Sequence, residues 1–272
     1  MWGRFVSSRY TLGMTQSQLL VTTPSTGCSD EAPRYSLLMT RNGADVEAAQ
    51  RLRCQVFAGE LGAHLGEGGR DGRDVDRFDE HCDHLVVRAD RTGEIVGTYR
   101  MLPPERAVAA GGYYSETEFD LSALAELRPG LVEAGRACVH PDHRSGAVIS
   151  LIWAGIARYL LLTGHSRLIG CASVPLADGG ATAAGVWGLA QAKHLSPPEL
   201  RVRPWRPWDA WAAPQAARTV IPPLLRGYLR LGAWVCGPPA HDPDFGVADL
   251  FILLPLDRVD SRYLRFFLGD GA

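Results

Sequence analysis

The sequence predicts an α/β protein of the mixed α+β type, in which a central mixed, mostly antiparallel sheet is flanked by helices and followed by a C-terminal extension. Two strand patterns joined by a tight turn, residues 84–88 and 94–100, indicate an antiparallel meander. A strand, an apolar helix and a second strand then follow between residues 131 and 174, which indicates a β–α–β unit. The 272 residues are 46% apolar and 21% charged, as in ordinary globular proteins, and a chain of this length needs no metal or disulfide to hold its core.

The elements are expected in the following order. Residues 1–33 are rich in Ser and Thr and have Leu19–Val21 as their longest apolar run, so we predict a disordered extension, with Met14 as an alternative start. Residues 34–272 are predicted to form one domain. It begins with a strand at 35–39 and a helix at 45–61, in which apolar residues recur at helical spacing. A loop at 67–83, the two meander strands, a strand at 131–139, a helix at 146–162 that ends at Gly164, a strand at 168–174, a helix at 222–231 and a strand at 248–254 complete the prediction.

The six cysteines occur singly and form no C-x-x-C pair. This pattern favours reduced thiols in a cytoplasmic protein over a disulfide framework. The most apolar run, residues 147–162, is interrupted by Arg158 and is shorter than the ~18 residues of a membrane span. We therefore expect no segment that crosses a membrane.

The strongest local signal for chemistry is Glu133-Ala-Gly-Arg136-Ala-Cys-Val139-His-Pro-Asp-His-Arg144-Ser145-Gly146. It reads as a strand that carries a carboxylate and a guanidinium, then a proline turn, then a basic helix N-terminus, where exposed N–H groups can bind phosphate. Residues three apart on a regular strand face opposite sides, so we predict a bulge near Gly135 that turns Glu133 and Arg136 toward one cavity. A surface ion pair followed by an ordinary turn is the alternative interpretation.

Three further features add charge to this site. Arg53 lies among apolar residues of the first predicted helix, and Arg100 ends a meander strand. Asp76 and Asp79 belong to the loop at 67–83, which carries seven acids and three arginines. Each of these residues could instead be an ordinary solvated charge.

Together these motifs resemble the ornithine-lipid N-acyltransferase family (L-ornithine N-alpha-acyltransferase) of the GNAT superfamily, a distant relative of the acyl-homoserine-lactone synthases. The resemblance rests on RLRCQVF, DRFDEHCDHLVV, GTYRMLP, EAGRACVHPDHR and the closing segment 221–246, and it extends from residue 34 to the C-terminus. It implies transfer of a fatty acyl group, often 3-hydroxylated, from acyl carrier protein to the α-amine of ornithine, the first step of ornithine-lipid synthesis. By position it implies that Arg53, Asp76, Asp79 and Arg100 bind substrate and that Glu133 and Arg136 are catalytic.

The donor is expected to be an acyl-phosphopantetheine carrier, with no permanently bound cofactor. Val139, Arg144, Ser145 and Gly146 are predicted to hold its phosphate. Coenzyme A users of the superfamily have more small residues at this turn than His-Arg-Ser-Gly-Ala-Val (143–148) provides, so acyl carrier protein is favoured over acyl-coenzyme A.

A mechanism follows as a hypothesis. Glu133 accepts a proton from the acceptor amine, directly or through water. Arg136 holds Glu133 ionised or anchors the acceptor carboxylate. Asp76 and Asp79 pair with the ammonium groups of a doubly cationic acceptor.

The region from Arg201 to Arg230 carries six arginines, one acid and several tryptophans. It suits an acidic acyl carrier protein or, through residues 201–211, peripheral contact with an anionic membrane at the inner face. Tryptophans packed on the core, with arginines extending past them, are the alternative. The net charge of −2 gives nucleic-acid binding little support. The pairs His81/His84 and His140/His143 lack the neighbouring ligands of a metal site, and none is expected.

Two alternatives stay open. A related N-acyl amino acid or lipid synthase would use another amine acceptor, such as glycine, lysine or a homoserine-type product, or acyl-coenzyme A as donor. A non-catalytic, GNAT-shaped membrane-associated (hemolysin-like) protein would bind without turnover.

Overall fold

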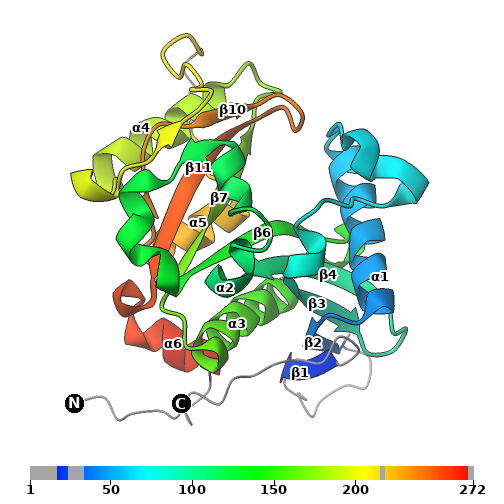
Figure 1. Cartoon of the computed structure of the whole chain (residues 1–272). Coiled ribbons are helices and arrows are strands. Elements are labelled where there is room, and N and C mark those ends of the chain that lie inside the picture. The colour runs from blue at the N-terminus through cyan, green and yellow to red at the C-terminus, as the bar shows by residue number, and fades with distance from the viewer. Residues whose placement is uncertain (1–16, 24–33, 215–217, 269–272) are drawn as a thin grey trace, which may run out of the picture.

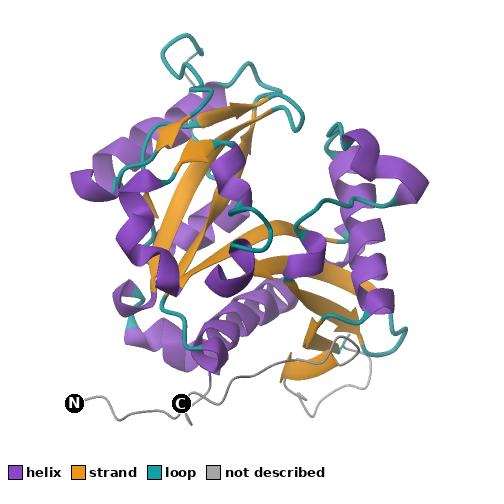
Figure 2. Cartoon of the chain, in the orientation of Figure 1, coloured by secondary structure: helices purple, strands orange, loops and turns teal. Residues whose placement is uncertain are grey.

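The structure, a computed structural model, describes residues 17–23, 34–214 and 218–268. Figure 1 shows one large sheet with helices on both of its faces, and Figure 2 shows the same arrangement by secondary structure. The strands are β1 (Ser17–Thr22), β2 (Tyr35–Thr40), β3 (Asp83–Ala89), β4 (Ile95–Leu102), β5 (Phe119–Asp120), β6 (Leu131–Val139), β7 (Arg167–Pro175), β8 (Arg203–Pro204), β9 (Trp234–Val235), β10 (Ala240–Asp242) and β11 (Val247–Pro255). The helices are α1 (Gly43–Cys54), α2 (Pro104–Ala107), α3 (Gly146–Thr163), α4 (Ala181–Lys193), α5 (Pro223–Arg230) and α6 (Ser261–Leu268).

The main sheet has the strand order β1-β2-β3-β4-β6-β7-β11-β10, with β9 paired to β11. Its neighbours are antiparallel except β6 and β7, which are parallel and are connected by α3. β5 and β8 form a separate two-stranded sheet. The predicted mixed, mostly antiparallel sheet is confirmed.

Helices cover both faces of the N-terminal half of the sheet. All six residues of β2 are buried, because Leu37 packs into the core that contains α3, whereas Leu38 packs into the core that contains α1. Successive residues of a strand point to opposite faces, so a strand buried on both sides is apolar throughout. α1 and α3 therefore lie on opposite faces, as Figure 1 shows.

Helix α3 is long and apolar enough to meet the length and composition criterion for a membrane span, contrary to our expectation from the sequence. In the structure it is a core helix. Ten of its residues, Val148 and Tyr159 among them, are buried, and it contacts β1, β2 and β3. It ends where predicted, at Gly164, whose φ of 74° is the left-handed conformation that glycine adopts readily.

The prediction that residues 1–33 are disordered is wrong for residues 17–22. They form the edge strand β1, which pairs antiparallel with β2 and buries Leu20. Pairing with an already apolar strand stabilises this short segment, which its own composition does not reveal. Residues 1–16 and 24–33, including Met14, lie outside the described residues.

Two helices differ from the prediction. α1 stops at Cys54, and one turn of π-helix over Gln55–Glu60 continues the segment that was predicted as a single helix. α4 was not predicted, because its interior glycines lower helix propensity. It nevertheless buries Ala183, Val186, Trp187 and Ala190, which recur at helical spacing. The other predicted strands and helices, apart from shifts at their ends, are present.

Candidate functional site

Strand β6 separates from β7 at the centre of the molecule. Their parallel pairing ends at Glu133 and Ile169. One residue further, a side chain at Gly170 would place its Cβ 2.3 Å from the carbonyl oxygen of Ala134, so only glycine permits this close approach. Beyond it, the β7-facing edge of β6 has no partner in the β6–β7 ladder and can pair with an extended ligand.

The predicted bulge in β6 is present. Between Thr98 and Arg100 of β4, the pairing passes from Cys138 to Gly135, so β6 contains one extra residue. The left-handed residue is Arg136, with a φ of 53°, and not the glycine before it. Because of the bulge, Glu133 and Arg136 both line one cavity, as predicted.

This main cavity has a volume of about 800 Å³, within the usual range for small-molecule sites. It extends from Glu60 past Glu133 to Asp249, and apolar side chains form much of its wall. These include Phe57, Leu61, Phe78, Leu102 and Leu224. A smaller cavity of about 510 Å³ shares Tyr114, Arg136 and Asp242 with it.

Glu133 is buried and held by a short turn of 3-10 helix, Tyr114–Thr117. Its Oε1 accepts hydrogen bonds from the Ser115 N–H (2.7 Å) and hydroxyl (2.6 Å), and its Oε2 accepts one from the Tyr114 N–H (2.6 Å). Burial raises the pKa of Glu133, and these hydrogen bonds oppose the rise. A carboxylate can accept about four hydrogen bonds, so Oε2 retains a position for water or an amine proton.

Three arginines and three aspartates form a buried ion network beside the cavity. Arg53, with 0% exposure, donates to Asp74 (2.8 Å) and to both oxygens of Asp79 (2.9 and 2.8 Å). Arg100 donates to Asp76 (2.6 Å) and Asp79 (3.0 Å). The network joins α1 and β4 to the acidic loop between them.

The predicted role of Asp79 in binding an acceptor ammonium is not supported by this geometry. Asp79 also accepts hydrogen bonds from Gln50 and from the Asp76 N–H, so its carboxylate is already saturated. Burial alone would raise the pKa of Asp79, but the hydrogen bonds and charge of Arg53, with the charge of Arg100, hold it well below its usual range. Asp79 and Arg53 therefore position the loop, whereas Arg100 also lines the main cavity and Asp76 the smaller one. The predicted binding of substrate by Arg100 and Asp76 stays a prediction.

Arg136 contacts the network and the cavity wall at once. Its Nε lies 3.1 Å from Asp74 Oδ2, and its Nη2 donates to Asp76 (3.3 Å). Its guanidinium lies over the rings of Tyr114 and Phe245, at 4.9 and 5.1 Å. Among the described hydrogen bonds and ion pairs, none joins Arg136 to Glu133. The geometry therefore does not support the prediction that Arg136 holds Glu133 ionised; the N–H groups of Tyr114 and Ser115 stabilise the Glu133 carboxylate instead.

The predicted phosphate residues gather at the end of β6 and the start of α3. Ser145 is the N-cap of α3 but makes no side-chain capping bond, and Gly146 is exposed. The first N–H groups of an 18-residue helix are thus directed at solvent. Arg144 donates to the Val139 carbonyl (3.2 Å) and forms a two-bond ion pair with Glu60 (2.6 and 2.5 Å).

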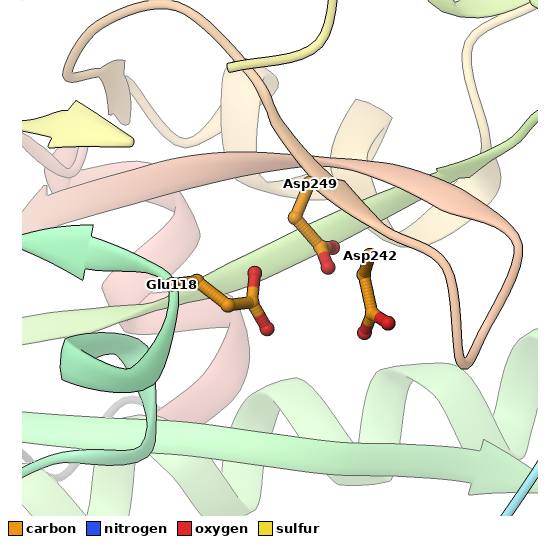
Figure 3. A group of neighbouring side chains, drawn as sticks. All are labelled: Glu118, Asp242 and Asp249. Carbon is orange, nitrogen blue, oxygen red and sulfur yellow. The ribbon is translucent and has the colours of Figure 1, made fainter. Parts of the chain in front are cut away.

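Three acids that sequence reasoning did not select lie close together where the two cavities meet: Asp249 lines the main cavity, Glu118 the smaller one and Asp242 both. Carboxylate oxygens of Glu118, Asp242 and Asp249 all lie within 4.8 Å of one another (Figure 3). They come from the end of the Tyr114–Thr117 turn and from the β10–β11 hairpin. Their distance in the sequence concealed them, since only the fold brings position 118 next to 242 and 249.

The arrangement suits acyl transfer to an amine. A buried carboxylate with one free position can accept a proton, an unpaired strand edge can hold an extended pantetheine arm, and an uncapped helix N-terminus can hold its phosphate. Splayed β6 and β7 strands and the α3 N-terminus define the protein as an N-acyltransferase with the GNAT fold. A family profile described as "Acetyltransferase (GNAT) domain" matches residues 52–154.

Solved structures agree with the fold. The acyl-homoserine-lactone synthase LasI matches with a TM-score of 0.50 at 13% identity, over 89% of this chain and 98% of LasI. FeeM, an N-acyl amino acid synthase from uncultured soil microbes, also has a TM-score of 0.50, at 12% identity over 84% of this chain and 94% of FeeM.

Sequence relatives define the family more closely. L-ornithine N(alpha)-acyltransferase of Rhizobium meliloti (strain 1021) is 34% identical over 86% of this chain and 84% of that protein. The protein of the same name from Brucella abortus (strain 2308) is 35% identical over 86% of this chain and 88% of its own length. The chain belongs to the L-ornithine Nα-acyltransferase family, and the resemblance seen in its motifs is confirmed.

Proposed function

We propose that the protein transfers a fatty acyl group, including 3-hydroxylated chains, from acyl carrier protein to the α-amine of ornithine, the first step of ornithine-lipid synthesis. One observation carries the proposal: a single cavity is lined by Glu60, which pairs with Arg144 at the helix start, by Glu133 and by apolar side chains. The thioester arm, the base and an alkyl chain can therefore meet in one place. The names of the relatives support ornithine as the acceptor.

In this proposal Glu133 receives the proton of the α-ammonium, directly or through a water at Oε2. The free amine attacks the thioester carbonyl, the C–N bond forms and the C–S bond breaks. The carrier thiolate leaves and takes up the second proton, which the new amide nitrogen loses. The bulge and the separation of β6 from β7 leave backbone N–H groups near Arg136 and Ala137 outside the strand ladder. Such groups can donate to the developing oxyanion.

Acyl carrier protein is the proposed donor because the part of the site that would bind phosphate, at the start of α3, is small. One uncapped helix terminus and Arg144 serve a single phosphate, and Arg144 must exchange Glu60 for it. Acidic carrier protein also complements the arginines between positions 201 and 230, all of which are exposed.

We also propose peripheral contact of the cytoplasmic protein with the inner face of the membrane. Trp205 and Trp211 are 60% and 87% exposed, whereas Trp208 is half-buried and packs on the core. Trp205 and Arg206 line the smaller cavity, so the amphipathic segment 201–211 borders the site. A lipid product could leave toward a membrane surface there.

The test uses purified protein with acyl carrier protein thioesters and with acyl-coenzyme A, each offered to a panel of ornithine, lysine, glycine and homoserine. Products are identified by mass spectrometry. We expect Nα-acylornithine, formed faster from the carrier protein. Free carrier thiol without any acceptor dependence, or acylation of another amine alone, would contradict the proposal.

A further inference from the structure

The carboxylates of Glu118, Asp242 and Asp249 lack a counter-ion. Within residues 17–23, 34–214 and 218–268, none of the three takes part in an ion pair. Arg100 and Arg136 line the main cavity, but Arg100 is paired with Asp76 and Asp79, and Arg136 with Asp74 and Asp76. Arg206 lines the smaller cavity, and no ion pair of the described residues joins it to the three acids. Three acids this close repel one another unless one of them holds a proton or a cation lies among them.

Glu118 shows most clearly that a partner is missing. Both of its carboxylate oxygens are buried, and neither accepts a hydrogen bond of normal geometry from the described chain, although the side chains of Tyr114 and Asp249 lie close enough to influence its pKa. Figure 3 shows this side chain pointing toward Asp242 and Asp249. A buried carboxylate with no donor is costly, so the site is suited to a ligand that brings N–H donors and positive charge.

The turn at Tyr114–Thr117 fixes this acid relative to the proposed base. Its first N–H groups bind Glu133, and Glu118 is the residue that ends it. The same turn therefore binds Glu133 at its start and carries Glu118 at its end.

Strand β7 also links the surroundings of Glu133 to the acid cluster. Cys171 contacts the Ser115 hydroxyl (3.4 Å) that binds Glu133, and Ser173 donates to Asp249 (2.6 Å). Residues 171 and 173 are on one face of the strand, about 6.6 Å apart. The acid cluster is therefore separated from Glu133 by a distance similar to the length of a short amino-acid side chain.

We infer that Glu118, Asp242 and Asp249 bind the side-chain ammonium of the amino-acid acceptor and so select an amino acid with a second positive charge. The inference rests on the proposed function, since it assumes that the α-amine of this acceptor reacts beside Glu133. An ammonium group has three N–H donors and no acceptor, which matches three convergent carboxylates. This inference replaces the prediction that Asp76 and Asp79 bind the ammonium groups of the acceptor.

The experiment compares ornithine with norvaline, which has the same carbon skeleton without the side-chain ammonium. Wild-type protein, Glu118→Gln and Asp249→Asn are assayed with one acyl carrier protein thioester. The ratio of kcat/KM for ornithine to kcat/KM for norvaline should fall by about tenfold or more in each variant, through a higher KM for ornithine. The control is Glu199→Gln, which removes an exposed carboxylate outside the cluster and should leave the ratio unchanged.

Thermal unfolding confirms that each variant is folded. Folded variants that keep the wild-type ratio would overturn the inference and leave the proposed function standing. Loss of activity with both amino acids after chelation, restored by Mg²⁺ or Zn²⁺, would mean that the acids bind a metal and would also overturn it. A wild-type protein that acylates neither amino acid would refute the proposed function itself.

Discussion

Three acidic side chains of the candidate site have different surroundings. Glu133 is surrounded by N–H and O–H donors, Asp79 by arginines, and Glu118 by other acids. The sequence could identify Glu133 and Arg136, because a strand glycine predicts a bulge that turns both residues inward. It could not separate Asp79 from Glu118, because the presence or absence of a cationic partner depends on tertiary contacts.

Glu118 should make stability fall as pH rises. Burial raises the pKa of Glu118 to about 9, and the carboxylate of Asp249 adds to the effect. Glutamate in an unfolded chain titrates near 4.3. Between these values the folded protein holds a proton that the unfolded chain has lost, so its free energy of unfolding decreases with pH.

Glu118→Gln removes this titration. One proton changes the free energy of unfolding by about 1.4 kcal/mol per pH unit, so we expect the variant to gain up to about 5 kcal/mol relative to wild type between pH 5 and pH 9, measured by thermal or denaturant unfolding at several pH values. A difference between the two proteins that does not change with pH would contradict the assignment.

At the scale of elements, most strands of the main sheet and the helices α1 and α3 follow from apolar spacing and were predicted closely. β1 and α4 were missed, the first because its partner strand provides its stability and the second because of its glycines. The ion network is the other feature that spacing cannot show. It fixes the acidic loop against α1 and the bulged strand β6 through Arg53 and Arg136.

Removal of Asp79 should therefore destabilise the fold. Asp79→Ala deprives Arg53, which is fully buried, of one of its two carboxylate partners and of two hydrogen bonds. We expect the free energy of unfolding to fall by about 3–5 kcal/mol in denaturant titrations. Asp90→Ala, in an exposed turn, is the control and should change it little. A loss below 1 kcal/mol for Asp79→Ala would show that the network is not structural.

The start of α3 should determine affinity for the donor. Arg144→Gln removes a charged donor from the phosphate position, so the KM for acyl carrier protein should rise about tenfold with little change in kcat. Glu60→Gln removes the competing carboxylate and should lower that KM or leave it unchanged. Steady-state kinetics at fixed ornithine measures both, and equal KM values for Arg144→Gln and wild type would exclude the site.

At the scale of the whole molecule, the fold class and the order of the sheet elements were predictable from pattern and resemblance. The way the cavity brings together Glu60, Glu133 and two of the clustered acids was not, because it depends on residues from separate segments of the chain. The same holds for the tryptophans of segment 201–211. Only the structure shows that Trp205 and Trp211 are the exposed ones.

Those two residues should carry any membrane contact. In flotation with vesicles that contain anionic lipid, we expect wild-type protein to float with the vesicles. Trp205→Ala/Trp211→Ala should float less, and high salt should reduce binding further because arginines contribute. Trp208→Ala serves as the comparison, because Trp208 packs on the core and its removal tests the effect of lost packing on flotation. Wild-type protein that stays unbound would remove the membrane role.

The most direct test of the central claim, that Glu133 accepts the proton of the attacking amine, is the pH dependence of kcat for Glu133→Gln. With acyl carrier protein thioester and ornithine, the variant should turn over about 10²–10⁴-fold more slowly near neutral pH and recover partly as alkaline solution deprotonates the amine. A thermal unfolding curve close to that of wild type shows that the Tyr114–Thr117 turn still forms. Turnover equal to that of wild type at every pH would contradict the account.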